Sequence, residues 1–168
     1  MIEIRWHGRA GQGAKTASQL LAAAAMDAGQ YVQAFPEYGP ERSGAPMRAY
    51  TRIAERRIRR RYGITDPDVV ALLDETLLDE ANATAGLRAE GVLIVNSERQ
   101  LAGAICIPAT RLADEGAGYV NVVMLGAVAA ALGEPPLDAV LAAAEAKGVS
   151  RADIERGYNA VAEARCTT

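Results

Sequence analysis

The sequence predicts an α/β protein: a single three-layer α/β/α domain around a mostly parallel sheet, with a helical C-terminal part. Three observations lead to this fold class. The 168 residues have the length of one domain, so we assign residues 1–168 to it. Half of the residues are hydrophobic while only 5% are aromatic, and small side chains suit helices packed closely on a sheet. Short apolar runs also alternate with segments of helical periodicity.

The first 35 residues have the pattern of a β–loop–α–β unit. Residues 2–6 alternate as in a strand, and residues 14–28 carry apolar side chains at helical spacing. Gly29 marks the end of that helix, and a second strand is expected over residues 31–35. The first strand and the helix are joined by the glycine-rich turn Gly8-Arg9-Ala10-Gly11-Gln12-Gly13.

The middle of the chain predicts more strands. A strand over residues 47–53 follows the loop of residues 36–46, whose three prolines and two glycines restrict its backbone. Residues 69–73 and 92–95 are apolar runs of the buried-strand type, and a weaker strand is expected over residues 104–108.

Residues 56–61 contain five arginines. The simplest interpretation is an exposed strand edge or hairpin that charge protects against aggregation. The alternative is an interface with an acidic subunit or with the phosphates of a cofactor.

The C-terminal third is predicted to be helical. Helices are expected over residues 121–132 and 137–147, and Ser150 with Asp153 forms a capping box that opens a third. Met124 and Val128 lie at helical spacing and are expected in the core.

Composition and charge exclude several classes of function. A net charge of −3 gives no global field for nucleic acid or an anionic membrane, so neither is expected as a partner. Cys106 and Cys166 form no C-x-x-C pair, so no metal site is predicted within this chain. A strand pattern begins directly after Met1, and the apolar stretch 120–132 is too short to span a bilayer; we therefore expect a cytoplasmic protein.

The glycine-rich turn is the strongest local signal for a ligand. Its glycines allow close approach to the backbone, and the following helix directs unpaired N–H groups at an anion. A tight β–α turn without a ligand is the alternative. The glycine order is G-x-x-G-x-G and not the dinucleotide-binding G-x-G-x-x-G, although Glu37 follows the second strand where a ribose-binding acid would lie. A P-loop, G-x-x-x-x-G-K-[ST], is rejected because Ala14 stands between Gly13 and Lys15. This one inserted residue rotates Lys15 by about 100° around the helix and moves it away from the phosphates.

Two long motifs together resemble a known family. They are Trp6-His7-Gly8-Arg9-Ala10-Gly11-Gln12-Gly13 and Phe35-Pro36-Glu37-Tyr38-Gly39-Pro40-Glu41-Arg42-Ser43-Gly44-Ala45-Pro46. Asp66-Pro67-Asp68-Val69-Val70 and Asn121-Val122-Val123-Met124-Leu125-Gly126-Ala127 also match. The chain resembles the gamma subunit of the 2-oxoacid:ferredoxin oxidoreductases, which include the pyruvate and ketoisovalerate enzymes. Two features depart from the family pattern: Ala10, where glycine is usual, and the arginine run.

The resemblance implies a subunit of a complex that oxidatively decarboxylates a 2-oxoacid to an acyl-CoA. Such a complex uses thiamine diphosphate with Mg²⁺, [4Fe-4S] clusters and coenzyme A, and it passes electrons to ferredoxin or another acceptor. This chain lacks a thiamine motif and a cysteine ligand set. Its expected role is therefore accessory: completing the site, binding coenzyme A, or bridging the alpha, beta and delta-type subunits.

No residue of this chain is predicted to be catalytic, and His7 is interpreted as a structural hydrogen-bonding group. The predicted cofactor-binding residues are Gly8, Gly11, Gln12 and Gly13. The predicted loop that forms a site wall or partner contact contains Glu37, Tyr38, Gly39, Glu41, Arg42 and Gly44. The alternatives are a stand-alone nucleotide- or dinucleotide-binding protein and a purely structural assembly subunit.

Overall fold

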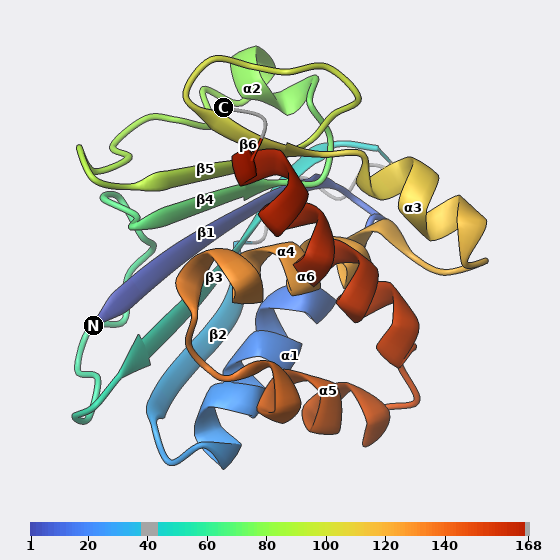
Figure 1. Cartoon of the computed structure of the whole chain (residues 1–168). Helices are drawn as coiled ribbons and strands as arrows, with labels where there is room; N and C mark the ends of the chain where they lie inside the picture. Colours follow the sequence, from blue (N-terminus) through green and yellow to red (C-terminus); the bar gives the residue numbers. More distant parts are fainter. Residues whose placement is uncertain (38–43, 167–168) are drawn as a thin grey trace.

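The structure is a computed structural model that describes residues 1–37 and 44–166. Its elements, in chain order, are β1 (Ile2–Arg9), α1 (Ala14–Asp27), β2 (Tyr31–Glu37), β3 (Pro46–Ala54), β4 (Val69–Leu72), α2 (Leu77–Glu80), β5 (Val92–Asn96), β6 (Ala104–Ile107), α3 (Ala109–Glu115), α4 (Val120–Leu132), α5 (Leu137–Glu145) and α6 (Arg151–Cys166). The strands form one six-stranded sheet in the order β2-β3-β1-β4-β5-β6 (Figure 1).

The sheet is mostly parallel, as predicted. Strands β1, β4, β5 and β6 pair in parallel, whereas β3 runs antiparallel to both of its neighbours. The antiparallel pairing follows from the short connection between β2 and β3, because only antiparallel neighbours can be joined without a crossover.

Every strand and helix predicted from periodicity is present, with small differences in length. β1 continues through Gly8 to Arg9, so the turn before α1 is shorter than the glycine spacing suggested. The short helices α2 and α3 were not predicted, because four and seven residues carry too little periodicity. The prediction of a strand edge or hairpin for residues 56–61 is wrong: that segment is exposed but belongs to irregular chain between β3 and β4.

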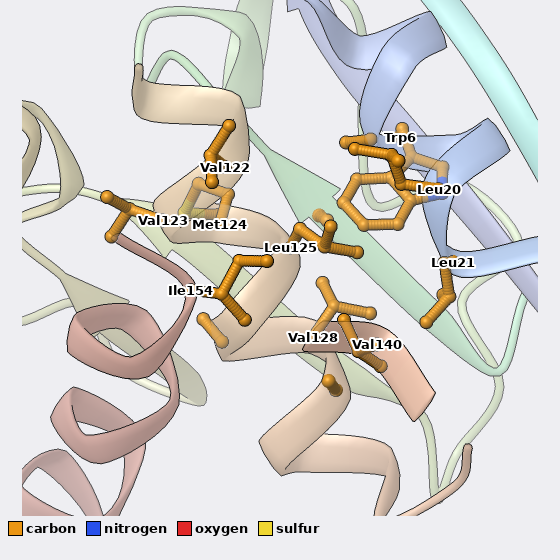
Figure 2. Packing of buried hydrophobic residues seen from close by; sticks show 14 of the residues in the cluster. Trp6, Leu20, Leu21, Val122, Val123, Met124, Leu125, Val128, Val140 and Ile154 are labelled. Atoms are coloured by element: carbon orange, nitrogen blue, oxygen red, sulfur yellow. The ribbon is translucent and has the colours of Figure 1, made fainter. Parts of the chain in front are cut away.

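One face of the sheet carries the main core. Helices α1, α4, α5 and α6 lie on this face (Figure 1), and Figure 2 shows Trp6, Leu21, Met124 and Leu125 packed between them and the strands. Met124 and Val128 are fully buried, which confirms their prediction as core residues.

Helices α4 and α6 cross with their backbones almost in contact. A Cβ on Gly126 would lie 1.9 Å from the carbonyl oxygen of Ile154, and one on Gly157 would lie 1.8 Å from that of Val123. Only glycine fits at this crossing.

Within the described residues no single helix is long and apolar enough to cross a membrane; α3 and α4 meet the length and composition criteria only as a pair bent by 120°.

The opposite face is covered mainly by irregular chain. A small apolar cluster around Val70, Leu72 and Leu77 packs under α2. Beside it, β1 turns Glu3, Arg5 and His7 toward this face, and all three are buried. The Arg5 guanidinium donates to the carbonyl oxygens of residues 64, 65, 83 and 85, so irregular segments supply the acceptors that helices could not. The second helical layer of the α/β/α arrangement therefore consists of the short helix α2 and irregular chain.

Candidate functional site

The glycine loop lies where the sheet changes direction. From β1 the chain builds β2 and β3 on one side of the sheet and β4, β5 and β6 on the other. The carboxyl ends of β1 and β4 therefore border the topological switch point, where open α/β sheets bind ligands.

The conformation of Gly13 fixes the start of α1. Gly13 has φ +81°, in the left-handed region, and a Cβ there would lie 2.6 Å from Nδ2 of Asn121. The same Nδ2 donates to the Gly13 carbonyl oxygen at 3.2 Å, so the loop is tied to the first turn of α4. None of the described side chains caps α1, which leaves its first N–H groups available to a ligand.

A cleft of about 600 Å³ opens beside this loop. The N-termini of three helices border it: α1 at Gly13, α4 at Val120 and α6 at Ser150. Tyr119, 74% exposed, lies at the same cleft. Among the described residues that line the cleft there is no lysine or arginine, and its carboxylates are Asp114 and Asp153. Attraction for an anion would therefore come from backbone N–H groups and helix dipoles.

Asp153 does not present a free negative charge to the cleft. It is 1% exposed and forms an ion pair with Arg156 of the same helix. The Ser150 hydroxyl accepts a hydrogen bond from the Asp153 N–H at 3.4 Å, the cap that the sequence predicted for this helix.

Three of the four predicted cofactor-binding residues line the cleft. Gly11, Gln12 and Gly13 line the cleft, whereas Gly8 lies within β1, close to Ala14. The Gln12 amide is engaged inside the loop: its oxygen accepts from the Arg9 N–H at 2.7 Å, and its nitrogen lies 3.4 Å from Asp74. The surfaces that this loop offers to a ligand are therefore mainly backbone.

Arg9 joins the glycine loop to the strand beside it. Its guanidinium contacts Asp74 at 3.0 Å, Glu80 at 2.6 Å and the Thr76 hydroxyl at 2.6 Å. The hydrogen bond with Glu80 raises the pKa of Arg9 above its ordinary value. Burial alone would raise the pKa of Asp74, but hydrogen bonds from Thr76 and Arg9 hold it below its ordinary value. Both groups are charged at neutral pH, and the switch point is bridged by this ion pair.

The two long sequence motifs meet at the glycine loop. Arg9 donates to the Gly44 carbonyl oxygen at 3.1 Å, and the Ala10 N–H donates to that of Ala45 at 2.9 Å. Gly44 is exposed at the end of the long loop. Of the other residues predicted for the site wall, Tyr38, Gly39, Glu41 and Arg42 lie outside the described residues.

Glu37 lies away from the cleft, at the end of β2. Its carboxylate accepts a hydrogen bond from the Tyr50 hydroxyl and lies 3.7 Å from Arg48. Burial and the hydrogen bond to Glu37 raise the pKa of Tyr50 to about 12, so the phenol stays protonated. Glu37 also borders a small pocket of about 200 Å³ that it shares with His7.

His7 has the environment of a structural group. It is 1% exposed, and its Nε2 accepts a hydrogen bond from Arg5 Nε at 3.1 Å. Burial, together with the charges of Arg5 and Arg48, lowers the pKa of His7 to about 3. The imidazole is neutral at physiological pH, and its unprotonated nitrogen, Nε2, is already occupied by the hydrogen bond from Arg5.

In the part of the chain that the structure describes, no three His, Cys, Asp or Glu side chains are grouped as metal ligands. Cys106 is buried, and its Sγ accepts from the Leu101 N–H at 3.3 Å.

Sequence reasoning missed Arg9, Asp74 and Asn121 as members of the site. Asp74 follows an apolar strand, and Arg9 and Asn121 lie within the motifs that carry the family resemblance, but none of these signals shows which side chains contact the glycine loop.

Comparison with known proteins places the chain among close relatives. The family model described as pyruvate ferredoxin/flavodoxin oxidoreductase matches residues 3–165. The pyruvate synthase subunit PorC of Thermotoga maritima is 51% identical over 151 residues, covering 83% of this chain and 78% of the relative. The common gamma subunit of the pyruvate/ketoisovalerate oxidoreductases of Thermococcus kodakarensis is 46% identical over 153 residues, covering 83% of each chain. The crystal structure of the Thermotoga maritima pyruvate oxidoreductase subunit PORC superimposes with a TM-score of 0.79 at 41% identity, covering 97% of this chain and 94% of the other.

Proposed function

The chain belongs to the pyruvate ferredoxin/flavodoxin oxidoreductase family as a gamma-type subunit, and we propose that it binds coenzyme A and bridges the catalytic subunits of a 2-oxoacid oxidoreductase. The resemblance that the two long motifs carried is confirmed over residues 3–165. Within such a complex a 2-oxoacid is oxidatively decarboxylated and its acyl group is transferred to coenzyme A.

The redox and decarboxylation chemistry is assigned to partner subunits. The described residues of this chain include no cluster of metal-ligating side chains, and the thiol of Cys106 is buried. We propose that the alpha, beta and delta-type subunits hold thiamine diphosphate, Mg²⁺ and the [4Fe-4S] clusters. Ferredoxin or another acceptor would then receive the electrons through the complex.

The cleft beside Gly13 is the observation that supports coenzyme A binding. Coenzyme A carries a pyrophosphate and a third phosphate, and the uncapped N-terminus of α1 offers N–H groups and a positive dipole end to them. Coenzyme A supplies the thiol that accepts the acyl group. The exposed ring of Tyr119 offers a flat face against which its adenine could stack.

The loop that begins at Glu37 and ends at Gly44 is proposed to face the catalytic subunits. Its end is joined to the glycine loop through Arg9 and Ala10. A partner subunit that contacts this loop would therefore also fix the conformation of the cleft, which gives one structural basis for completing a shared site.

The test is the dependence of the complex on coenzyme A when Tyr119 is changed. The assay is 2-oxoacid-dependent reduction of a viologen dye by the chain co-expressed with thiamine- and cluster-bearing partners. Tyr119→Ala should raise the KM for coenzyme A about tenfold, the loss of one base–aromatic stacking contact. The KM for the 2-oxoacid should stay unchanged.

Tyr31→Ala is the matched control, because Tyr31 is also an exposed tyrosine but lies at the start of β2. It should leave both KM values unchanged. An unchanged KM for coenzyme A in Tyr119→Ala, or binding of NAD or ATP by the isolated chain more tightly than coenzyme A, would contradict the assignment of this cleft.

A further inference from the structure

A second hollow lies at the opposite end of the sheet from the glycine loop. Its volume is about 670 Å³, and it is bordered by the first residues of β1, the end of β3 and the chain that follows β3. β1 runs from this hollow to the glycine loop (Figure 1). Eight residues of extended strand separate the two sites by on the order of 20 Å. We name it the arginine basin, after Arg56, Arg57, Arg59 and Arg60 in its lining.

Four of the five arginines between residues 56 and 61 differ from the other described arginines in having no partner; the fifth, Arg60, pairs with Glu3. Every described arginine side chain elsewhere in the chain forms an ion pair or donates to backbone carbonyl oxygens. Arg56, Arg57, Arg59 and Arg61 are exposed, and the structure gives their guanidinium groups no hydrogen bond or ion pair among the described residues. Among the arginine side chains that the structure describes, the uncompensated ones thus lie together in one segment of a protein whose net charge is −3.

The basin is held in shape by buried groups beneath it. Arg60 forms an ion pair at 3.3 Å with the buried Glu3, and its carbonyl oxygen accepts from Gln33 at 2.8 Å. The fully buried Arg52 pairs with Glu3 at 2.8 Å and donates to the Tyr62 carbonyl oxygen at 2.8 Å. The residues that carry Arg56, Arg57 and Arg59 therefore lie between two anchored points, the end of β3 at Ala54 and the contacts of Arg60.

We propose that the arginine basin docks an acidic, partly apolar segment of a partner protein. Arginine binds carboxylates with paired, directional hydrogen bonds, and three unpartnered guanidinium groups border one hollow. Ile2 and Ile58, both half-buried, also line it and provide an apolar surface for side chains between the carboxylates.

The lining favours an extended peptide over a compact phosphate ligand. Glu55 and Glu134 also border the basin and would repel a concentrated negative charge. An extended segment can place its carboxylates at Arg57 and Arg59 and its apolar side chains elsewhere. Because the basin is distant from the glycine loop, this docking site is separate from the coenzyme A cleft proposed above.

The first experiment measures binding of a probe peptide to the purified full chain. The probe is a short fluorescein-labelled peptide in which Glu alternates with Leu, compared with the same peptide carrying Gln in place of Glu. The acidic peptide should bind, its affinity should fall with salt, and the Gln peptide should not bind. Arg57→Gln/Arg59→Gln should weaken binding at least about tenfold.

Arg111→Gln/Arg151→Gln is the matched control. Both arginines are exposed and ion-paired on α3 and α6, so this variant loses the same charge outside the basin. It should bind the acidic peptide within about twofold of the parent. Equal binding by the two double variants, or equal binding of the two peptides, would overturn the proposal. Binding of pyrophosphate without binding of the acidic peptide would also overturn it and would reassign the basin to phosphate.

The second experiment uses the assembled complex. A photo-crosslinking residue in place of Arg57 should form crosslinks to a segment of another protein that is rich in Asp and Glu. Crosslinks confined to this chain or to a second copy of it would contradict the proposal, independently of how the coenzyme A assay turns out.

Discussion

Gly13→Ala is predicted to destabilise the chain through two separable effects. The first is conformational: Gly13 has φ +81°, and a residue with a Cβ in the left-handed region costs roughly 1–2 kcal/mol. The second is steric. The new methyl group would lie 2.6 Å from Nδ2 of Asn121, which is 8% exposed, so this amide must rotate and lose its hydrogen bond to the Gly13 carbonyl oxygen. That loss adds about 1 kcal/mol.

The expected total is about 2–3 kcal/mol, or a melting temperature lowered by about 5–10 °C for a domain of this size. Gly29→Ala isolates the conformational effect. Gly29 has φ +86°, but a Cβ there meets no described atom within 4 Å, so its cost should be only roughly 1–2 kcal/mol.

Urea denaturation of the full chain, followed by circular dichroism, gives the free energies of unfolding. A double-mutant cycle with Asn121→Ala should recover about 1 kcal/mol, because the truncated side chain no longer obstructs the methyl group. The reasoning is refuted if Gly13→Ala costs no more than Gly29→Ala and its effect is additive with that of Asn121→Ala.

Three further predictions concern the helix crossing, the buried histidine and the activity of the chain. Gly126→Ala and Gly157→Ala should each lower the free energy of unfolding by at least about 3 kcal/mol, because the new methyl group would overlap a backbone carbonyl of the other helix. Gly103→Ala is the control: a Cβ there meets no described atom within 4 Å, so it should cost only roughly 1–2 kcal/mol. Thermal unfolding of the three variants measures the difference. The pKa of His7 is lowered to about 3, so the unfolded chain takes up a proton that the folded chain does not between pH 6.5 and 3. Stability should fall as the pH falls through this window, and in His7→Asn its slope against pH should be smaller by about one proton; equal slopes in urea denaturation at several pH values would contradict the burial of a neutral imidazole. The isolated chain should show no 2-oxoacid-dependent reduction of viologen and should gain it with thiamine- and cluster-bearing partners; activity of the chain alone would contradict its accessory role.

The strands and long helices could be predicted from the sequence because they depend on local periodicity. The apolar runs at residues 69–73 and 92–95 became adjacent parallel strands, and the helical spacing of Met124 and Val128 placed both in the core. The two long motifs also carried the family resemblance, because each is a continuous stretch of the chain.

The site depended on contacts between distant parts of the chain. Arg9 and Asp74, and likewise Gly13 and Asn121, are brought together only when β1, β4 and α4 assemble. Hydrogen bonds from the end of the long loop to the glycine loop join two motifs that α1 and β2 separate in the sequence.

The arginine run shows the same dependence on tertiary contacts. From composition and position its five arginines were interpreted as a solvated strand edge. In the folded chain Arg60 forms an ion pair with Glu3, because the buried charge of Glu3 must be compensated. Arg56, Arg57 and Arg59 have no such partner and border the arginine basin. Periodicity sets which residues face inward, but the pairing of charges depends on distances between strands far apart in sequence, and those distances exist only once the sheet has formed.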